Sequence, residues 1–213
     1  MGTPIIDDLK DAIDVMIHPT NYGYKTMGIG EGIVKYYKVM LIPMLLAIIL
    51  SVVFMGSAAG VLGMAIGGIA AVAVFINYII GIPIELLIGA FIVQLIAGNV
   101  LKWFKGGFSA TFAAYVFAMF PTLLIGWLSP VPILGLLLSI IAAIWSFIVL
   151  IFALAKLHNI SAGKAFLGLL VTFIIIVVII VIIALIIGVA FLGALLGSGA
   201  LGAHAANYTT TAI

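Results

Sequence analysis

The sequence predicts an all-α protein, a polytopic bundle of transmembrane helices. Its 213 residues are 67% hydrophobic and only 7% charged, and the mean hydropathy is +1.51. A soluble domain carries about a quarter charged residues, so this chain has too few charges to cover a surface in water. Long uncharged runs at 39–84, 106–155 and 165–213 can each hold at least one span of about 20 residues.

The composition also excludes several classes of function. A soluble enzyme, a nucleic-acid-binding protein and a secreted disulfide scaffold are incompatible with so apolar a chain. The chain contains no cysteine, which excludes disulfides, thiol catalysis and cysteine-based metal sites. The formal charge of +2 is too small to indicate an electrostatic partner. The lipid bilayer is the first partner that the sequence implies.

Residues 3–17 predict a short amphipathic N-terminal helix, because apolar residues recur at helical spacing among four aspartates and Lys10. Pro4 suits its first position, and Pro19 ends it. Helices that lie on a membrane surface usually carry Lys or Arg on their polar face, so the aspartates disfavour adhesion to anionic lipid. We therefore expect the apolar stripe to pack on the protein's own bundle rather than on a partner. The stripe consists of Ile5, Ile6, Leu9, Ile13, Met16 and Ile17.

The lysines predict how the chain crosses the membrane. All eight fall into three clusters: the N-terminal region, Lys102 with Lys105, and Lys156 with Lys164. Cytoplasmic loops carry an excess of lysine, and two spans between successive clusters place all three in the cytoplasm. A third span between Lys38 and Lys102 would move the last two clusters outside. The sequence therefore predicts five spans in the cell membrane, with the N-terminus in the cytoplasm and the C-terminus outside.

Three regions follow from this arrangement. Residues 1–38 are a cytoplasmic helix and connector, residues 39–191 are the transmembrane bundle, and residues 192–213 are an extracytoplasmic tail, in which Asn207 starts a glycosylation sequon. The glycine-rich segment 60–81 is predicted to be a re-entrant or outer-leaflet helix packed against the bundle. The five spans are expected at about 39–58, 82–103, 108–128, 133–157 and 164–191.

Small residues predict which spans form the core. Such residues three or four positions apart let helix backbones approach closely in a membrane. The third and fourth spans each carry one of these faces, and the last span, rich in Ile and Val, is expected to lie against lipid. The two faces consist of Ala110, Ala114 and Ala118 in the third span and of Gly135, Ser139, Ala142 and Ser146 in the fourth.

Polar residues at membrane depth are the candidates for function, because they are costly there. Glu85 is predicted near the outer end of the second span and Gln94 near its middle. Nine positions at about 100° each place them on opposite faces of a helix. For Gln94, which shares a face with small residues, we favour a hydrogen bond between helices. For Glu85 we favour solvation near the headgroups, or capping of the glycine-rich segment, over a substrate or proton role.

Two further polar candidates, His158 and Lys164, lie around the last cytoplasmic connector. The three histidines of the chain show no ligand spacing, so the sequence predicts no metal site and no cofactor. No arrangement of acid, base and nucleophile occurs at one depth. The chain is therefore not expected to be an enzyme.

Three segments together resemble the Yip family, the Rab/Ypt-interacting integral membrane proteins, in its prokaryotic form. The first is Ile17–Thr20, and the second is Lys105–Ser109, which leads to Pro121. The third is Leu157–Ala165 in the last connector. The resemblance runs from about residue 14 to residue 180 and implies a five-span fold with a cytoplasmic N-terminus.

The resemblance also guides the functional hypothesis. Eukaryotic members of the family bind Rab GTPases and carry an Asp-Leu-x-Gly-Pro-Leu element near the first span. The corresponding segment here, Tyr36–Pro43, lacks the aspartate and the Gly-Pro pair, so Rab binding is not carried over. The leading hypothesis is a non-enzymatic membrane scaffold or adaptor that organises the membrane, a protein partner or copies of itself. A small channel or transporter and an accessory subunit of a larger membrane complex remain as alternatives.

Overall fold

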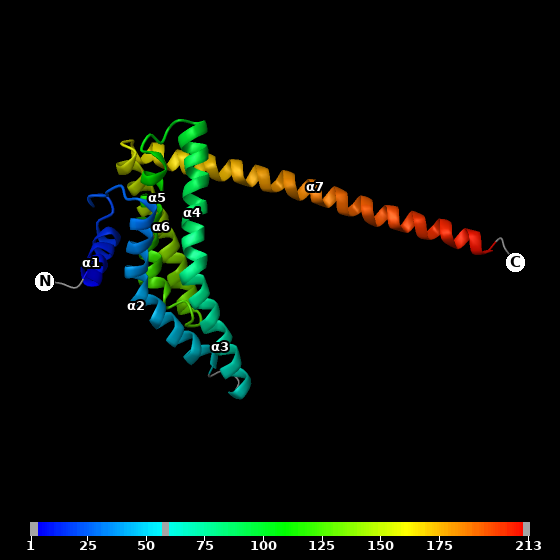
Figure 1. Cartoon of the computed structure of the whole chain (residues 1–213), viewed down its shortest axis with the longest axis horizontal. Coiled ribbons are helices and arrows are strands. Elements are labelled where there is room, and N and C mark those ends of the chain that lie inside the picture. Colours follow the sequence, from blue (N-terminus) through cyan, green and yellow to red (C-terminus); the bar gives the residue numbers. More distant parts are fainter. Residues whose placement is uncertain (1–3, 57–59, 211–213) are drawn as a thin grey trace. The chain divides into compact units, whose positions relative to one another are not determined.

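The computed structural model describes residues 4–56 and 60–210, and the regular elements in these ranges are all helices (Figure 1). Within them, five helical stretches are long and apolar enough to cross a membrane: Ile29–Phe54, Gly63–Val100, Gly107–Gly126, Leu134–Leu157 and Ala162–Ala194. The predicted all-α, multi-pass architecture is thus confirmed. The helices are α1 (Pro4–Ile17), α2 (Ile29–Gly56), α3 (Gly60–Ile76), η1 (Asn77–Gly81), α4 (Ile82–Val93), η2 (Gln94–Val100), α5 (Gly107–Gly126), α6 (Leu134–Leu157) and α7 (Ala162–Thr210), where η1 and η2 are π-helical.

The chain divides into two units, residues 1–169 and residues 170–213. The first unit contains α1 to α6 and the first turns of α7, and all sites described below belong to it. The second unit is the rest of α7, which continues as a helix to Thr210. The predicted tail therefore begins as helix, because residues 192–210 contain no proline. The side chain of Asn207 lies outside the described part of the chain.

Helix α5 is the centre of the first unit. It contacts α1, α2, α4 and α6, which run alongside it in Figure 1. The predicted small-residue face lies at these contacts, since Ala110, Ala114 and Ala118 are all buried. On α6, Gly135 and Ala142 are buried as well. Small side chains of this kind let neighbouring helices approach closely.

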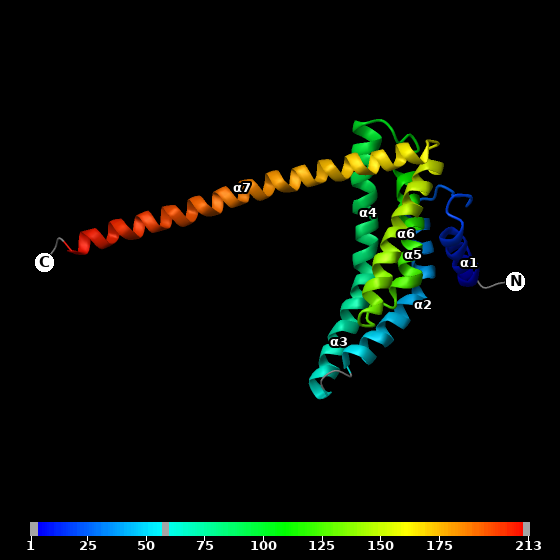
Figure 2. The ribbon, with the colours of Figure 1, turned by 180° about the vertical axis from the view of Figure 1, so that it is seen from behind.

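Helix α2 begins at Ile29, ten residues before the expected membrane boundary at Val39. Lysines and tyrosines mark the headgroup region, but they do not interrupt a helix, so the helix extends into the predicted connector. Its partner is α3, which packs along α2 and forms a hairpin with it. Figure 2 shows this hairpin reaching past the turn between α5 and α6. The predicted end of the first span, Ala58, lies outside the described residues.

The glycine-rich segment is helical, and it continues directly into the second span. Helices α3, η1, α4 and η2 follow one another from Gly60 to Val100 without an intervening loop. At about 1.5 Å per residue, the stretch Gly63–Val100 is longer than a bilayer core of about 30 Å. The predicted re-entrant segment is therefore the first half of one long helix.

Two tyrosines of α2 stabilise the π-helical turn η1. There the backbone N–H of Ile82 donates to Asn77, and Pro83 has no N–H to donate. The carbonyls of Tyr78 and Ile79 lose their α-helical partners as a result. The hydroxyl of Tyr36 donates to the first carbonyl at 2.6 Å, and the hydroxyl of Tyr37 donates to the second at 2.8 Å. The two carbonyls that lose their helical partners thus accept hydrogen bonds that join α2 to the second span.

Candidate functional site

The chain brings His158 into the core directly after α6. Its side chain is only 2% exposed. The backbone N–H of Gly106 donates to its Nδ1 at 2.8 Å, and the ring of Phe104 stacks on the imidazole with 4.7 Å between centroids. The connector before α5 and the connector after α6 are therefore joined through one histidine.

Gly106 is required for this close approach. A Cβ atom at this position would lie 2.7 Å from the carbonyl oxygen of Leu157 and 3.1 Å from Nδ1 of His158. The first distance is shorter than van der Waals contact and involves backbone, which cannot move aside easily. Only glycine lets the two connectors meet in this way.

A hydrogen-bonded chain extends from His158 into the bundle. Nδ1 accepts the bond from Gly106, so the proton of the neutral ring is on Nε2, which lies 3.1 Å from Oγ1 of Thr111. The threonine hydroxyl in turn donates to Oε1 of Gln94 at 2.6 Å. All three side chains are buried. We call Gln94, Thr111 and His158 the polar core; it joins η2, α5 and the end of α6.

The polar core has the properties of a structural network. Burial lowers the pKa of His158 to about 4, so the ring is neutral near pH 7. Nε2, which faces Thr111, already carries the ring proton and cannot accept the proton of the threonine hydroxyl. His158 therefore cannot act as a base toward this hydroxyl. Thr111 is also fully buried. In the described part of the chain, no group of three or more acidic or histidine side chains could hold a metal ion.

A second set of polar contacts holds α1 against the bundle. Lys38 pairs with Asp8 at 3.1 Å, and Lys35 pairs with Asp11. The hydroxyl of Tyr22 also donates to Asp11, and both burial and this carboxylate raise the pKa of the phenol. Two of the aspartates that distinguish this helix from a lipid-binding one therefore bind the beginning of α2.

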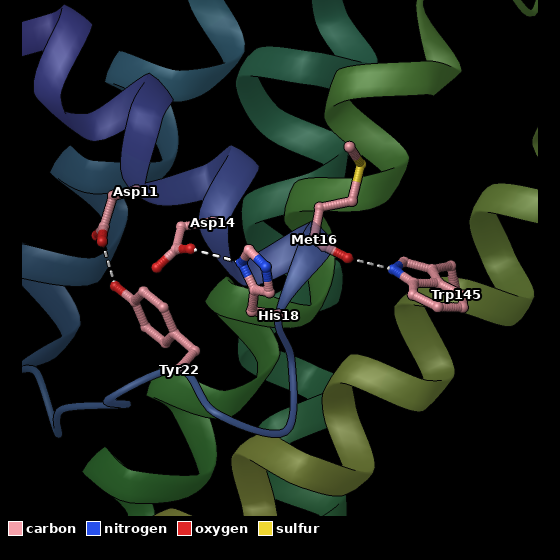
Figure 3. Close-up of polar contacts among 6 residues, drawn as sticks. All are labelled: Asp11, Asp14, Met16, His18, Tyr22 and Trp145. Atoms are coloured by element: carbon pink, nitrogen blue, oxygen red, sulfur yellow. Dashed lines mark hydrogen bonds and ion pairs between the residues drawn. The ribbon is translucent and has the colours of Figure 1, made fainter.

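The connector after α1 and the exposed side of α6 complete this contact. The rings of Tyr22 and Tyr24 pack on Phe117 of α5, with centroids 5.5 and 5.3 Å away. The indole N–H of Trp145 donates to the carbonyl of Met16 at 2.7 Å. Figure 3 shows both ends of the contact, with Tyr22 directed at Asp11 and Trp145 directed at the end of α1. Helix α1 thus covers α5 between α2 and α6.

The docked face of α1 differs from the expected stripe. Ala12 and Val15 are fully buried, whereas Ile13 is 43% exposed. Ile6 and Ile17 are also exposed, so this part of the expected docking stripe was wrong. The helix is rotated so that Asp8 and Asp11 reach the lysines of α2, which moves these three isoleucines to the outer side.

The other candidates are not brought together. Glu85 lines a cavity beside α5 and α6, and the polar core does not include it. The cavity also borders Thr122, which lies about one turn before the end of α5, and Ser146, which lies near the middle of α6. Lys164 is at the start of α7, where its backbone N–H donates to the Ser161 hydroxyl. The Lys164 ammonium lies 6.0 Å from the centroid of the Trp103 ring.

The predicted small-residue face of α6 carries one polar contact. The hydroxyls of Ser146 and Thr122 lie 2.8 Å apart and link α6 to α5. Ser139 is half-buried on the same helix. The sequence reasoning missed Thr111, Tyr22 and Trp145 as contact residues. Their signals were weak, because a threonine, a tyrosine or a tryptophan near a membrane is ordinary until its partner is known.

The fold and these contacts define a multi-pass helical membrane protein. Residues 14–185 match the Yip1 domain, and the chain therefore belongs to the Yip1 domain family. The segments that resembled this family include Gly106 and His158, which lie in contact. No curated protein matches the chain, and no solved structure does.

Proposed function

We propose that the chain is a non-enzymatic membrane scaffold or adaptor that organises protein partners or copies of itself. The observation that supports this function best is the polar core. In this network Thr111 is hydrogen-bonded to both Gln94 and His158. Buried polar groups in membrane proteins often serve ions, protons or substrates, and here they hold three helical segments together.

The outer side of α1 is a suitable surface for a partner. It presents Ile6, Ile13 and Ile17 next to Asp7 and Asp14, all of them exposed. A surface with isolated apolar side chains beside charges is typical of contacts between proteins. Because α1 is fixed to α2 and α6, this surface is held rigidly relative to the bundle.

The proposed orientation places α1 and both connectors of the polar core in the cytoplasm. The chain has no cysteine, so single cysteines report accessibility without background. A cysteine at Ser161 should be labelled from the cytoplasmic side, and a cysteine at Ser129 from the opposite side. Labelling of both positions from one side would contradict five spans.

The scaffold proposal also predicts that purified protein in sealed liposomes shows no ion or solute flux above empty vesicles. The reason is that the buried polar groups of the polar core are occupied in structural hydrogen bonds. A saturable flux that is lost in Glu85→Gln or in Gln94→Ala would replace the scaffold by a small channel or transporter. The cavity at Glu85 is the feature that favours this alternative.

An accessory subunit of a larger membrane complex is the third candidate. The outer side of α1 favours it as much as it favours a scaffold. Purification in a mild detergent separates the two, because an accessory subunit elutes with a constant set of other proteins. A scaffold built from copies of this chain elutes as a homo-oligomer.

A further inference from the structure

A cavity of about 290 Å³ lies between α4, α5 and α6. Its lining includes four polar residues, Glu85, Tyr115, Thr122 and Ser146, of which the last two are hydrogen-bonded to each other. Its other walls are apolar. They are formed by Leu86, Gly89, Ala118, Met119, Phe147 and Leu150.

The shape of the cavity depends on a glycine. A Cβ atom on Gly89 would lie 2.6 Å from the Tyr115 ring, so the absence of a side chain lets this ring lie against α4. Tyr115 and Phe147 both line the cavity, so two aromatic residues are available to an occupant. Aromatic faces attract cations.

Glu85 gives the cavity its charge. It is the only acidic residue after Glu31 in the chain. The ion pairs of the described residues use Asp8, Asp11 and Asp14 and leave Glu85 without a cationic partner. Glu85 is itself an exposed residue, next to the exposed Ile84 and Ile88. A carboxylate that faces lipid instead of water is stabilised by a cation nearby. The cavity therefore lacks a positive group, and the protein does not supply one from the described residues.

The opening of the cavity indicates where such a group comes from. The neighbours of Glu85 on the outer side of α4, Ile84 and Ile88, are 50% and 54% exposed, and Phe147 on α6 is 44% exposed. These side chains belong to the apolar surface of helices that cross the bilayer. An occupant that enters here comes from the lipid phase.

We propose that this cavity binds a bilayer amphiphile with an amine or quaternary ammonium group. The ammonium lies against the Glu85 carboxylate and the faces of Tyr115 and Phe147. The alkyl chain lies along Met119 and Leu150 and continues into the lipid. This binding is independent of the scaffold function, which rests on the polar core and on α1.

The test uses the purified full chain in a nonionic detergent and native mass spectrometry. The probe is dodecyltrimethylammonium, and dodecanol is the uncharged control with the same alkyl chain. We expect saturable binding of one ammonium probe per chain, with a preference over dodecanol of about tenfold or more. Glu85→Gln should abolish this preference and leave the weak binding of dodecanol unchanged. Glu85→Asp keeps the charge and should retain most of the preference.

Glu31→Gln is the matched control, because Glu31 is a glutamate outside the cavity, and this variant should bind like the wild type. Tetramethylammonium, which has the headgroup without the chain, should not compete. Equal binding of the two dodecyl probes, an unchanged preference in Glu85→Gln, or effective competition by tetramethylammonium would each overturn the proposal. The elution volume of every variant establishes that it is folded.

Discussion

Val15→Asp is expected to release α1 from the bundle. Val15 is fully buried between α1 and the rest of the first unit, and a carboxylate at this position would be buried without a cation. That cost is several kcal/mol. The released helix no longer holds the following connector against Phe117, so trypsin should cut at Lys25 much faster than in the wild type. Mass spectrometry of the fragments measures this cut.

Ile13→Asp is the matched control for the same substitution on the same helix. Ile13 is 43% exposed, so the new carboxylate stays in contact with water or the headgroup region. Cleavage at Lys25 should remain close to the rate of the wild type. Equal acceleration in both variants would mean that α1 is not docked through the face that contains Ala12 and Val15.

The second large effect concerns pH. The pKa of His158 is lowered by burial to about 4, below its value of about 6.5 in an unfolded chain. Between these values the unfolded state binds more protons, so the free energy of unfolding falls as the pH decreases from about 6.5 to about 4. The loss amounts to about 3 kcal/mol when the decrease is complete. Protonation also places an N–H on Nδ1 opposite the N–H of Gly106, which removes that hydrogen bond.

Thermal unfolding in detergent at several pH values measures this effect. His158→Phe keeps a ring that stacks on Phe104 but cannot be protonated, so the variant should be less stable near neutral pH. Between pH 6.5 and 4, the free energy of unfolding of this variant should fall by about 3 kcal/mol less than that of the wild type. Parallel curves for the two proteins would show that another group is responsible for acid sensitivity.

The sequence predicted the main architecture because that architecture depends on local properties. Spans follow from the length of apolar runs, and the N-terminal helix follows from its period and from Pro4 and Pro19. The side of that helix that docks depends instead on where Lys35 and Lys38 lie after folding. The apolar period grouped Ile13 with the residues expected to be buried. A period shows which residues share a face of the helix, but not how the helix is rotated against its neighbours.

The polar core was beyond sequence reasoning for a related physical reason. Gln94, Thr111 and His158 are separated by 17 and 47 positions, and nothing in the helical period brings them together. The cost of burying an amide in the membrane predicted that Gln94 makes a hydrogen bond between helices. Which atoms donate and accept in the polar core follows only from the tautomer of His158. The sequence also divided the long helix Gly60–Val100 into two elements, because its glycine-rich first part was expected to be re-entrant.

The two π-helical turns of that helix also affect how its relatives should be aligned. A π-helical turn typically arises where one extra residue is accommodated in an α-helix, so η1 and η2 each shift the angular phase of whatever follows them. The directions in which the side chains of Glu85 and Gln94 point thus depend partly on the number of residues in the π-helical turn before them, and not only on the residue types. A family member that differs by one residue within 77–81 can keep every side chain of its second span and still direct its acidic residue away from the cavity. Length in this interval therefore carries functional information that a comparison of residue types alone discards.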